Sequence, residues 1–290
     1  MIGENQLTMR NIKERDFYQF AENLTTKWWF YAFLVLCVFI PPYTQNGFSS
    51  FAALVETVAY VADFLIENKL VLVPYMPIFH LCFLLLFGLL FIYGNRFGRT
   101  FSIVAGFHFV FITFLQGGAV TQKYGMVFYP NAFLEISLIS FGWFWEAKIR
   151  KTDYSFKRKA PTYYWFAGIV MVFSFWNPDK LGTLSPLSLL TSTSPIAFCM
   201  ITPIYLSLLS LLYPDINIPF FRTASFVAIL VSLITIGMGF FMDNRSEGLY
   251  WSILHSPMLI TSVYCFLLGF QDSRSYSQQY SKLSSLSTSD

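Results

Sequence analysis

The 290-residue chain contains 55% hydrophobic, 20% aromatic and only 12% charged residues, and its formal net charge is +3. A soluble domain carries about 25% charged residues, and its helices need a polar face, so this composition excludes an ordinary soluble fold. The net charge is too small, and too concentrated in loops, for a nucleic-acid-binding protein. Apolar stretches of roughly 16 to 24 residues match a hydrocarbon core of about 30 Å and predict an all-α polytopic membrane protein. The alternating strands of about ten residues that build a membrane barrel are absent.

Three parts can be distinguished along the chain. In segment 1–26, apolar residues recur at close to helical spacing over 6–26 and face a charged side, which predicts an amphipathic helix on the membrane surface. We interpret this helix as a membrane anchor, with partner binding as the alternative. A transmembrane domain follows over 27–270. The Ser-rich tail 271–290 has the composition of a disordered segment.

Eight spanning helices are predicted in the transmembrane domain. Their approximate bounds are 27–42, 72–94, 100–119, 126–147, 161–177, 195–213, 221–242 and 249–270. Pro203 is expected to bend the sixth of them. The additional stretch 47–68 is long enough to span, but it carries Glu56, Asp63 and Glu67. A carboxylate at the membrane centre costs about 2.5 to 3.5 kcal/mol on insertion scales, so we predict an interfacial or re-entrant segment on the outer side.

The stretch Glu146–Lys159, which reads EAKIRKTDYSFKRK, fixes the predicted orientation. It holds six of the nineteen Lys and Arg residues. With eight spans, fifteen of the nineteen lie on the side of both termini, and the positive-inside rule makes that side cytoplasmic. A ninth span over 47–68 would place the N-terminal and central charges on opposite sides. The expected location is therefore a membrane, most simply the cell membrane. The expected partners are the lipid bilayer and other membrane subunits, and no nucleic acid is expected to bind.

Four ionisable residues are predicted to share one layer in the outer half of the membrane. The three histidines of the chain, His80, His108 and His255, fall inside predicted spans, and Glu135 falls at a similar depth. At 1.5 Å per residue, the histidines lie roughly 9 to 17 Å below the outer surface. Ionisable groups at this depth usually face a protein interior or a cavity. We therefore expect a joint polar site.

Metal, haem, quinol and proton chemistry are all compatible with these residue types. Imidazole binds Zn, Cu and Fe, and histidines from two helices can ligate a haem iron from both faces. In this hypothesis His80, His108 and His255 bind a cofactor or metal, and Glu135 is a further ligand or transfers protons. Pro203 and Pro257 would add free backbone carbonyls at nearly the same depth.

Simpler interpretations stay open beside this one. An intramembrane histidine often only bonds to a neighbouring helix, at about 0.6 to 2 kcal/mol, and the prolines can serve packing alone. The motifs of metalloproteases, P-loop enzymes and α/β-hydrolases are absent. The leading prediction is a subunit of a larger membrane complex that binds a metal, haem or quinol. The alternatives are a proton-coupled or facilitative transporter of a small solute and a scaffold without a site.

Overall fold

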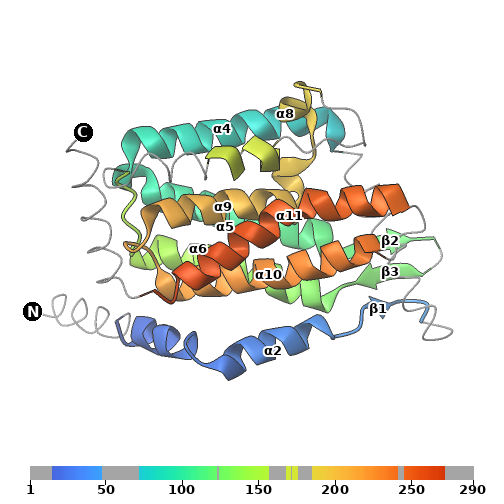
Figure 1. Cartoon of the computed structure of the whole chain (residues 1–290), viewed down its shortest axis with the longest axis horizontal. Coiled ribbons are helices and arrows are strands. Elements are labelled where there is room, and N and C mark those ends of the chain that lie inside the picture. Colours follow the sequence, from blue (N-terminus) through green and yellow to red (C-terminus); the bar gives the residue numbers. More distant parts are fainter. Residues whose placement is uncertain are drawn as a thin grey trace, which may run out of the picture.

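The computed structural model describes residues 15–47, 72–122, 124–156, 168–170, 172–175, 185–240 and 245–271. This part of the chain is mostly helical, and its long helices run side by side in alternating directions (Figure 1). In chain order the elements are α2 (Trp28–Val38), β1 (Tyr43–Thr44), η1 (Val73–Tyr75), α4 (Met76–Tyr93), α5 (Asn95–Gln116), β2 (Gly118–Thr121), β3 (Gly125–Phe128), α6 (Pro130–Ile149), α8 (Ser188–Thr191), η2 (Ser194–Ile196), α9 (Phe198–Leu212), α10 (Ile218–Phe240) and α11 (Arg245–Leu268).

Four of these helical stretches are long and apolar enough to cross a bilayer. They are Val73–Tyr93, Asn95–Gln116, Ile218–Phe240 and Arg245–Leu268. A fifth span is obtained if Ser188–Ile196 and Phe198–Leu212, which meet at 92°, are counted together. The chain is therefore a helical membrane protein, as its composition predicted.

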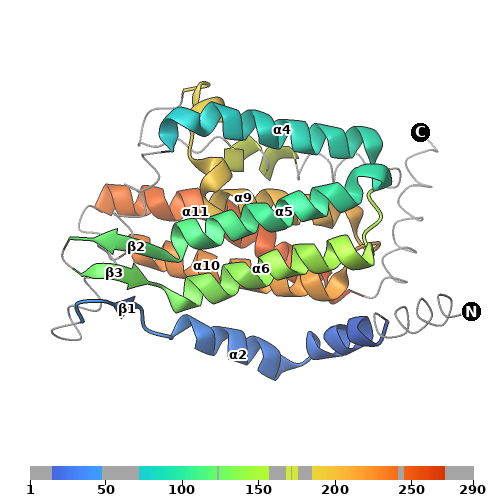
Figure 2. The same ribbon diagram turned by 180° about the vertical axis from the view of Figure 1, so that it is seen from behind.

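The helix connections gather at two ends of the bundle, which we call the basic end and the sheet end. At the basic end, α4 passes into α5 through Gly94 alone, whose φ of +51° permits an abrupt turn. The connection implied between the spans predicted at 72–94 and 100–119 is therefore not a loop, because Arg96 and Arg99 already belong to the first turns of α5. Helix α2 starts on the side of the basic end, where α11 ends (Figure 2). The Tyr31 ring of α2 contacts Phe266 and Phe270.

A three-stranded antiparallel sheet, with the order β1-β3-β2, forms the sheet end. It corrects the purely helical prediction for two regions. The helix expected over 100–119 ends at Gln116, and the one expected over 126–147 begins only at Pro130. The reason is local: Gly117 and Gly118 end α5, and Gly125 turns the hairpin with a φ of +66°.

Helix α9 lies at the centre of the bundle, and every one of its residues except Cys199 is buried. Its Tyr205 ring contacts the rings of six surrounding residues, which are Phe83, Phe87, Phe101, His108, Phe109 and Trp143. The sharp bend before α9 lies at Ala197, whose backbone is extended, and not at Pro203 as predicted. A turn that precedes the helix, not the proline inside it, thus redirects the chain.

Several predicted segments fall partly or wholly outside the described residues. The stretch 47–68 is described only at Gly47, and the tail 271–290 only at Gln271. The span expected over 161–177 is described as helix at 168–170 and 172–175. The N-terminal segment is helical over 15–24, within the amphipathic helix that the sequence predicted.

Candidate functional site

The His80 side chain is fully buried, and both of its ring nitrogens contact protein groups. Nδ1 lies 3.0 Å from Met76 O, and because a carbonyl only accepts, Nδ1 carries the proton. Nε2 lies 3.4 Å from the Ser192 hydroxyl. That hydroxyl also contacts Phe175 O at 2.9 Å and the Ser194 hydroxyl at 3.0 Å. His80 therefore joins α4 to the segment that leads into α9.

His108 is bound in the same way from α5. Its Nε2 donates to Pro195 O at 2.6 Å, so Nδ1 is the acceptor and takes a hydrogen bond from the Tyr205 hydroxyl at 3.2 Å. About two turns further along α5, the Gln116 amide donates to Ile196 O at 3.3 Å. Both histidines thus hold the residues around the bend at Ala197, and neither ring nitrogen of His108 has a lone pair free for a metal.

Glu135 and His255 lie in other surroundings. Glu135 on α6 is buried opposite Cys37 of α2, and its Oε1 makes no hydrogen bond to a described residue. His255 on α11 donates from Nδ1 to Trp251 O at 2.7 Å, and its ring lies against the Trp251 indole. Within the described ranges, no three His, Cys, Asp or Glu side chains come together in a group that could hold a metal ion.

The carbonyl that Pro257 leaves without a helical partner is not available to a ligand either. This carbonyl belongs to Ile253, and it accepts a hydrogen bond of 2.7 Å from the Ser256 hydroxyl. The proline inside α11 is thus accommodated by its own helix. A neighbouring hydroxyl is a usual way to satisfy such a group in a membrane.

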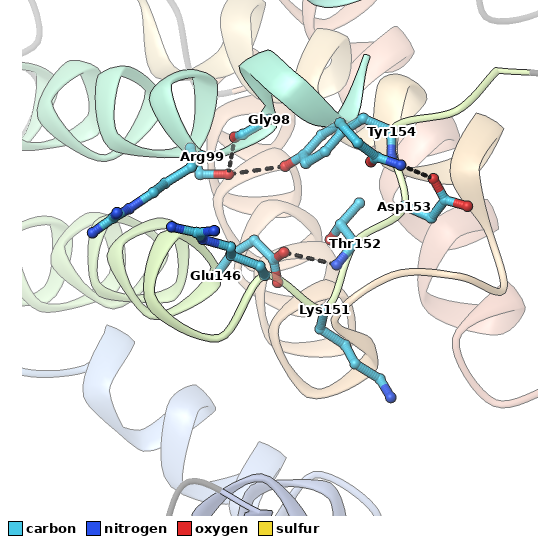
Figure 3. A pocket seen from close by; sticks show the side chains of 10 residues that line it. Gly98, Arg99, Glu146, Lys151, Thr152, Asp153 and Tyr154 are labelled. Carbon is cyan, nitrogen blue, oxygen red and sulfur yellow. Dashed lines mark hydrogen bonds between the residues drawn. The ribbon is translucent and has the colours of Figure 1, made fainter. Parts of the chain in front are cut away.

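A polar pocket of about 260 Å³ lies at the basic end, between the first turns of α5 and the last turn of α6 (Figure 3). It is closed by the chain that follows α6. The lining residues are Asn95, Gly98, Arg99, Ser102, Glu146, Arg150, Lys151, Thr152, Asp153 and Tyr154. Six of these ten residues come from the stretch Glu146–Lys159, whose charges predict the orientation of the chain.

The loop that closes the pocket is held in place by Asn95, the first residue of α5. Its amide donates to Asp153 Oδ1 at 2.6 Å, and its Oδ1 accepts from the backbone N–H of Tyr154 at 2.6 Å. The N–H of Asp153 donates to Asp215 O at 2.8 Å, which ties the loop to the chain before α10. Arg150 ends α6 in the left-handed conformation, with a φ of +53°. These bonds fix the pocket wall before any ligand arrives.

Two side chains form the buried floor of the pocket (Figure 3). The Tyr154 ring packs on Gly98, and its hydroxyl lies 2.9 Å from Ser102 Oγ, which itself donates to Gly98 O. Burial, with the Glu146 carboxylate nearby, raises the pKa of Tyr154, so this phenol stays neutral. Glu146 is 1% exposed, and its Oε1 accepts a 2.8 Å hydrogen bond from the N–H of Thr152.

The second carboxylate oxygen of Glu146 has no such bond. Oε2 of Glu146, Oγ1 of Thr152 and Nδ2 of Asn217 are all buried without a hydrogen-bond partner of good geometry among the described residues. The Thr152 hydroxyl, the Asn217 side-chain amide and the backbone N–H of Lys151 lie against the carboxylate as donors, and no described basic side chain does so. A buried carboxylate without a full set of donors is expensive for the fold.

Exposed basic residues surround the mouth of the pocket. Arg99 and Arg150 line it, and no described carboxylate forms an ion pair with either of them. Lys151 points away from the floor, and its ammonium group lies 5.2 Å from the centre of the Tyr18 ring (Figure 3). Tyr18 belongs to the N-terminal helix, and burial followed by the charge of Glu22 raises its pKa to about 12. The N-terminal helix is therefore in direct contact with the pocket wall.

No protein-family model matches the chain, and no curated protein or solved structure is similar enough to it to count as a match.

Proposed function

We propose that this chain is an integral membrane protein of eight spans, with both termini on the cytoplasmic side, that binds a small anionic ligand at its cytoplasmic surface. The observation that carries the proposal is the pocket at the basic end. It combines a rigid wall, a buried polar floor and two arginines, Arg99 and Arg150, that form no ion pair with a described residue. Guanidinium groups in this state bind phosphate and carboxylate groups through charge-assisted hydrogen bonds.

The cytoplasmic assignment follows from the distribution of basic residues. The described Lys and Arg residues of the helix ends gather at the basic end, and Arg245 at the start of α11 is at the sheet end. A cytoplasmic basic end agrees with the positive-inside rule. The ligand would then be a cytoplasmic anion or the headgroup of a lipid in the inner leaflet.

The basic-end pocket is a better candidate for the functional site than the metal, haem or quinol site predicted from His80, His108, His255 and Glu135. A subunit that binds a metal, haem or quinol through these residues needs them in one site, whereas His80 and His108 are engaged with protein groups. His255 and Glu135 have different neighbours. We therefore assign His80 and His108 a structural role, which is to hold the bend before α9.

A titration with short-chain phosphatidylglycerol and with inorganic phosphate tests this function on the purified protein. One charge-assisted hydrogen bond contributes about 1.5 to 3 kcal/mol, so Arg99→Gln should weaken binding about ten- to hundredfold. The matched control is Arg96→Gln, because Arg96 is exposed on the same helix but does not line the pocket. Equal losses in the two variants would mean that the ligand only follows the general positive charge, and the pocket would lose its role.

A transporter is the second candidate, favoured by the 92° bend between η2 and α9. Interrupted helices form substrate sites in several transporter folds, and Glu135 is a buried carboxylate without a partner for Oε1 among the described residues. In proteoliposomes with an internal pH dye, this function predicts a proton flux that Glu135→Gln removes. Glu247→Gln is the control, since Glu247 is exposed at the sheet end. The absence of flux in the unmodified protein would exclude the proton-coupled form.

A further inference from the structure

We infer that Arg222 binds the phosphodiester group of an anionic phospholipid in the leaflet at the basic end. Arg222 lies near the start of α10 and is only 9% exposed. It does not line the basic-end pocket, so this lipid site goes beyond the proposed function. The inference follows from the juxtaposition of a buried guanidinium group that forms no ion pair with a described residue and the exposed apolar side chains beside it.

The protein uses only part of the hydrogen-bonding capacity of Arg222. Its Nε donates to the carbonyl of Gly269, just beyond the end of α11, at 2.8 Å, and Nη1 lies 3.5 Å from Thr25 Oγ1. A guanidinium group has five N–H donors, and no described residue accepts a hydrogen bond from Nη2. In contrast to the Asn217 amide nitrogen, Nη2 is not enclosed by protein. Arg222 therefore has donors that a ligand can reach.

The charge of Arg222 has no counterion in the described part of the chain. The Gly269 carbonyl at the end of α11 supplies only a partial negative charge. The guanidinium carbon lies 4.6 Å from the centre of the Phe270 ring, a cation–π contact that attracts the cation without neutralising it. Removing a charge from water without an opposite charge is costly. An anion at Nη2 offsets this cost through charge-assisted hydrogen bonds.

Three separate segments hold the guanidinium group in position. They are the start of α10, the residue after α11 and the turn before α2, to which Thr25 belongs. The Thr25 hydroxyl itself donates to Glu22 O at 3.2 Å, which fixes its orientation. A Cβ atom at Gly269 would lie 2.9 Å from Arg222 Cγ, so the side chain passes directly over the backbone there. The donors are thus in place before an anion arrives.

The surroundings of Arg222 favour a lipid over a soluble anion. The Phe270 ring beside the guanidinium group is 43% exposed, and Tyr31 of α2 contacts this ring. Exposed apolar side chains continue along both helices, with Val263 and Leu267 on α11 and Trp29 and Phe33 on α2. Tryptophan at the start of a spanning helix marks the level of the headgroups. Basic sites between helices on the cytoplasmic side bind anionic headgroups, and acyl chains can cover the apolar side chains.

Native mass spectrometry of the purified protein tests this site by counting bound lipids. The probes are short-chain phosphatidylglycerol, phosphatidylcholine and glycerophosphoglycerol, which is the same headgroup without acyl chains. All variants are also made in an Arg99→Gln background, so that binding in the basic-end pocket is weakened. Because the choline group cancels the charge of its phosphodiester, we expect phosphatidylglycerol to bind at least about tenfold more tightly than phosphatidylcholine.

Arg222→Gln should weaken the binding of one phosphatidylglycerol molecule about ten- to hundredfold, because it removes a charge-assisted hydrogen bond. Arg222→Lys keeps the charge but not the planar fork, so its affinity should lie between those of the unmodified protein and Arg222→Gln. Arg96→Gln is the matched control, since Arg96 is exposed at the same end on another helix. An equal loss in Arg96→Gln would mean that only the general positive charge attracts the lipid, and would overturn the inference.

Two results on the unmodified protein also overturn the inference, even if Arg222→Gln does not fold. One is equal affinity for phosphatidylglycerol and phosphatidylcholine. The other is binding of glycerophosphoglycerol as tight as that of the lipid, which would show a soluble ligand. The proposed function is judged separately, by the loss of phosphate binding in Arg99→Gln. That loss leaves the pocket established if the lipid site fails, and its absence leaves the Arg222 site untouched.

Discussion

The Tyr154 ring lies so close to Gly98 that a Cβ atom at position 98 would overlap ring carbon Cδ2. This contact brings the loop after α6 onto the first turns of α5 and forms the floor of the pocket. The ring cannot move aside freely, because its hydroxyl is bound to Ser102. The floor of the pocket therefore requires glycine at position 98.

Gly98→Ala should displace Tyr154 and destabilise the protein. Overpacking of a buried contact costs about 1 to 3 kcal/mol, and ligand affinity should fall together with the unfolding temperature measured in detergent. Gly88→Ala on α4 is the control, because nothing lies within 4 Å of a Cβ atom there. A Gly98→Ala variant with unchanged stability and affinity would contradict the described packing of the Tyr154 ring.

Asn95→Asp should destabilise the protein in a pH-dependent manner. The substitution places a carboxylate 2.6 Å from Asp153 Oδ1, where the amide now donates. Two carboxylates at this distance cannot both ionise easily, so the variant should be less stable at pH 8 than at pH 5 relative to the unmodified protein. Asn95→Ala removes the same bonds without adding charge and should show a loss of similar size at both pH values. Thermal unfolding at the two pH values measures the difference.

His108 and Tyr205 should be energetically coupled. The Tyr205 hydroxyl donates to Nδ1 of His108, whose Nε2 holds Pro195 O. A double-mutant cycle with His108→Ala and Tyr205→Phe should give a coupling energy of about 0.5 to 3 kcal/mol in unfolding. Elemental analysis and an absorption spectrum of the same samples separate this role from metal or haem binding. Loss of a bound metal or chromophore in His108→Ala would show that the histidine is a ligand.

Single cysteines at Ser155 and Ser185 should react with an impermeant maleimide from opposite sides of sealed cells. Ser155 lies in the loop at the basic end, and Ser185 precedes α8 near the sheet end (Figure 1). The four native cysteines must first be replaced, since Cys82 is exposed on α4. Reaction of both positions from the same side would refute the eight-span topology.

The helical class could be predicted from the sequence because long apolar runs need no partner to be recognised. The bounds of α4, α10 and α11 were predicted to within a few residues for the same reason. The sheet was missed because β2 and β3 are only four residues long, and their apolar residues directly follow α5 and directly precede α6, so they look like extensions of those helices. The bend at Ala197 was missed because the prolines at 195 and 203 are equally visible in sequence, and only the fold shows that the helix begins between them.

The candidate pocket could be predicted only in part. The basic stretch after α6 was conspicuous in sequence, but its charges were explained by topology alone. Glu146 and Asn95 carry no local signal, because their importance comes from partners 6 and 58 residues away. The histidines show the opposite case. That the histidines are few and lie at a shared depth could be predicted from the sequence. Their partners, the Pro195 carbonyl for His108 and the Ser192 hydroxyl for His80, depend on how the segment before α9 folds back.

The enclosure of α9 has a consequence for the order of assembly in the membrane. Because every residue of α9 except Cys199 is buried by protein, almost none of its surface faces lipid, and Thr202, Ser207 and Ser210 are among its buried residues. Two of the helices that cover it, α10 and α11, are synthesised after it. We therefore expect α9 to reach its final surroundings only when α10 and α11 have been inserted. Chains that end before Arg245 should be recognised and degraded as incomplete.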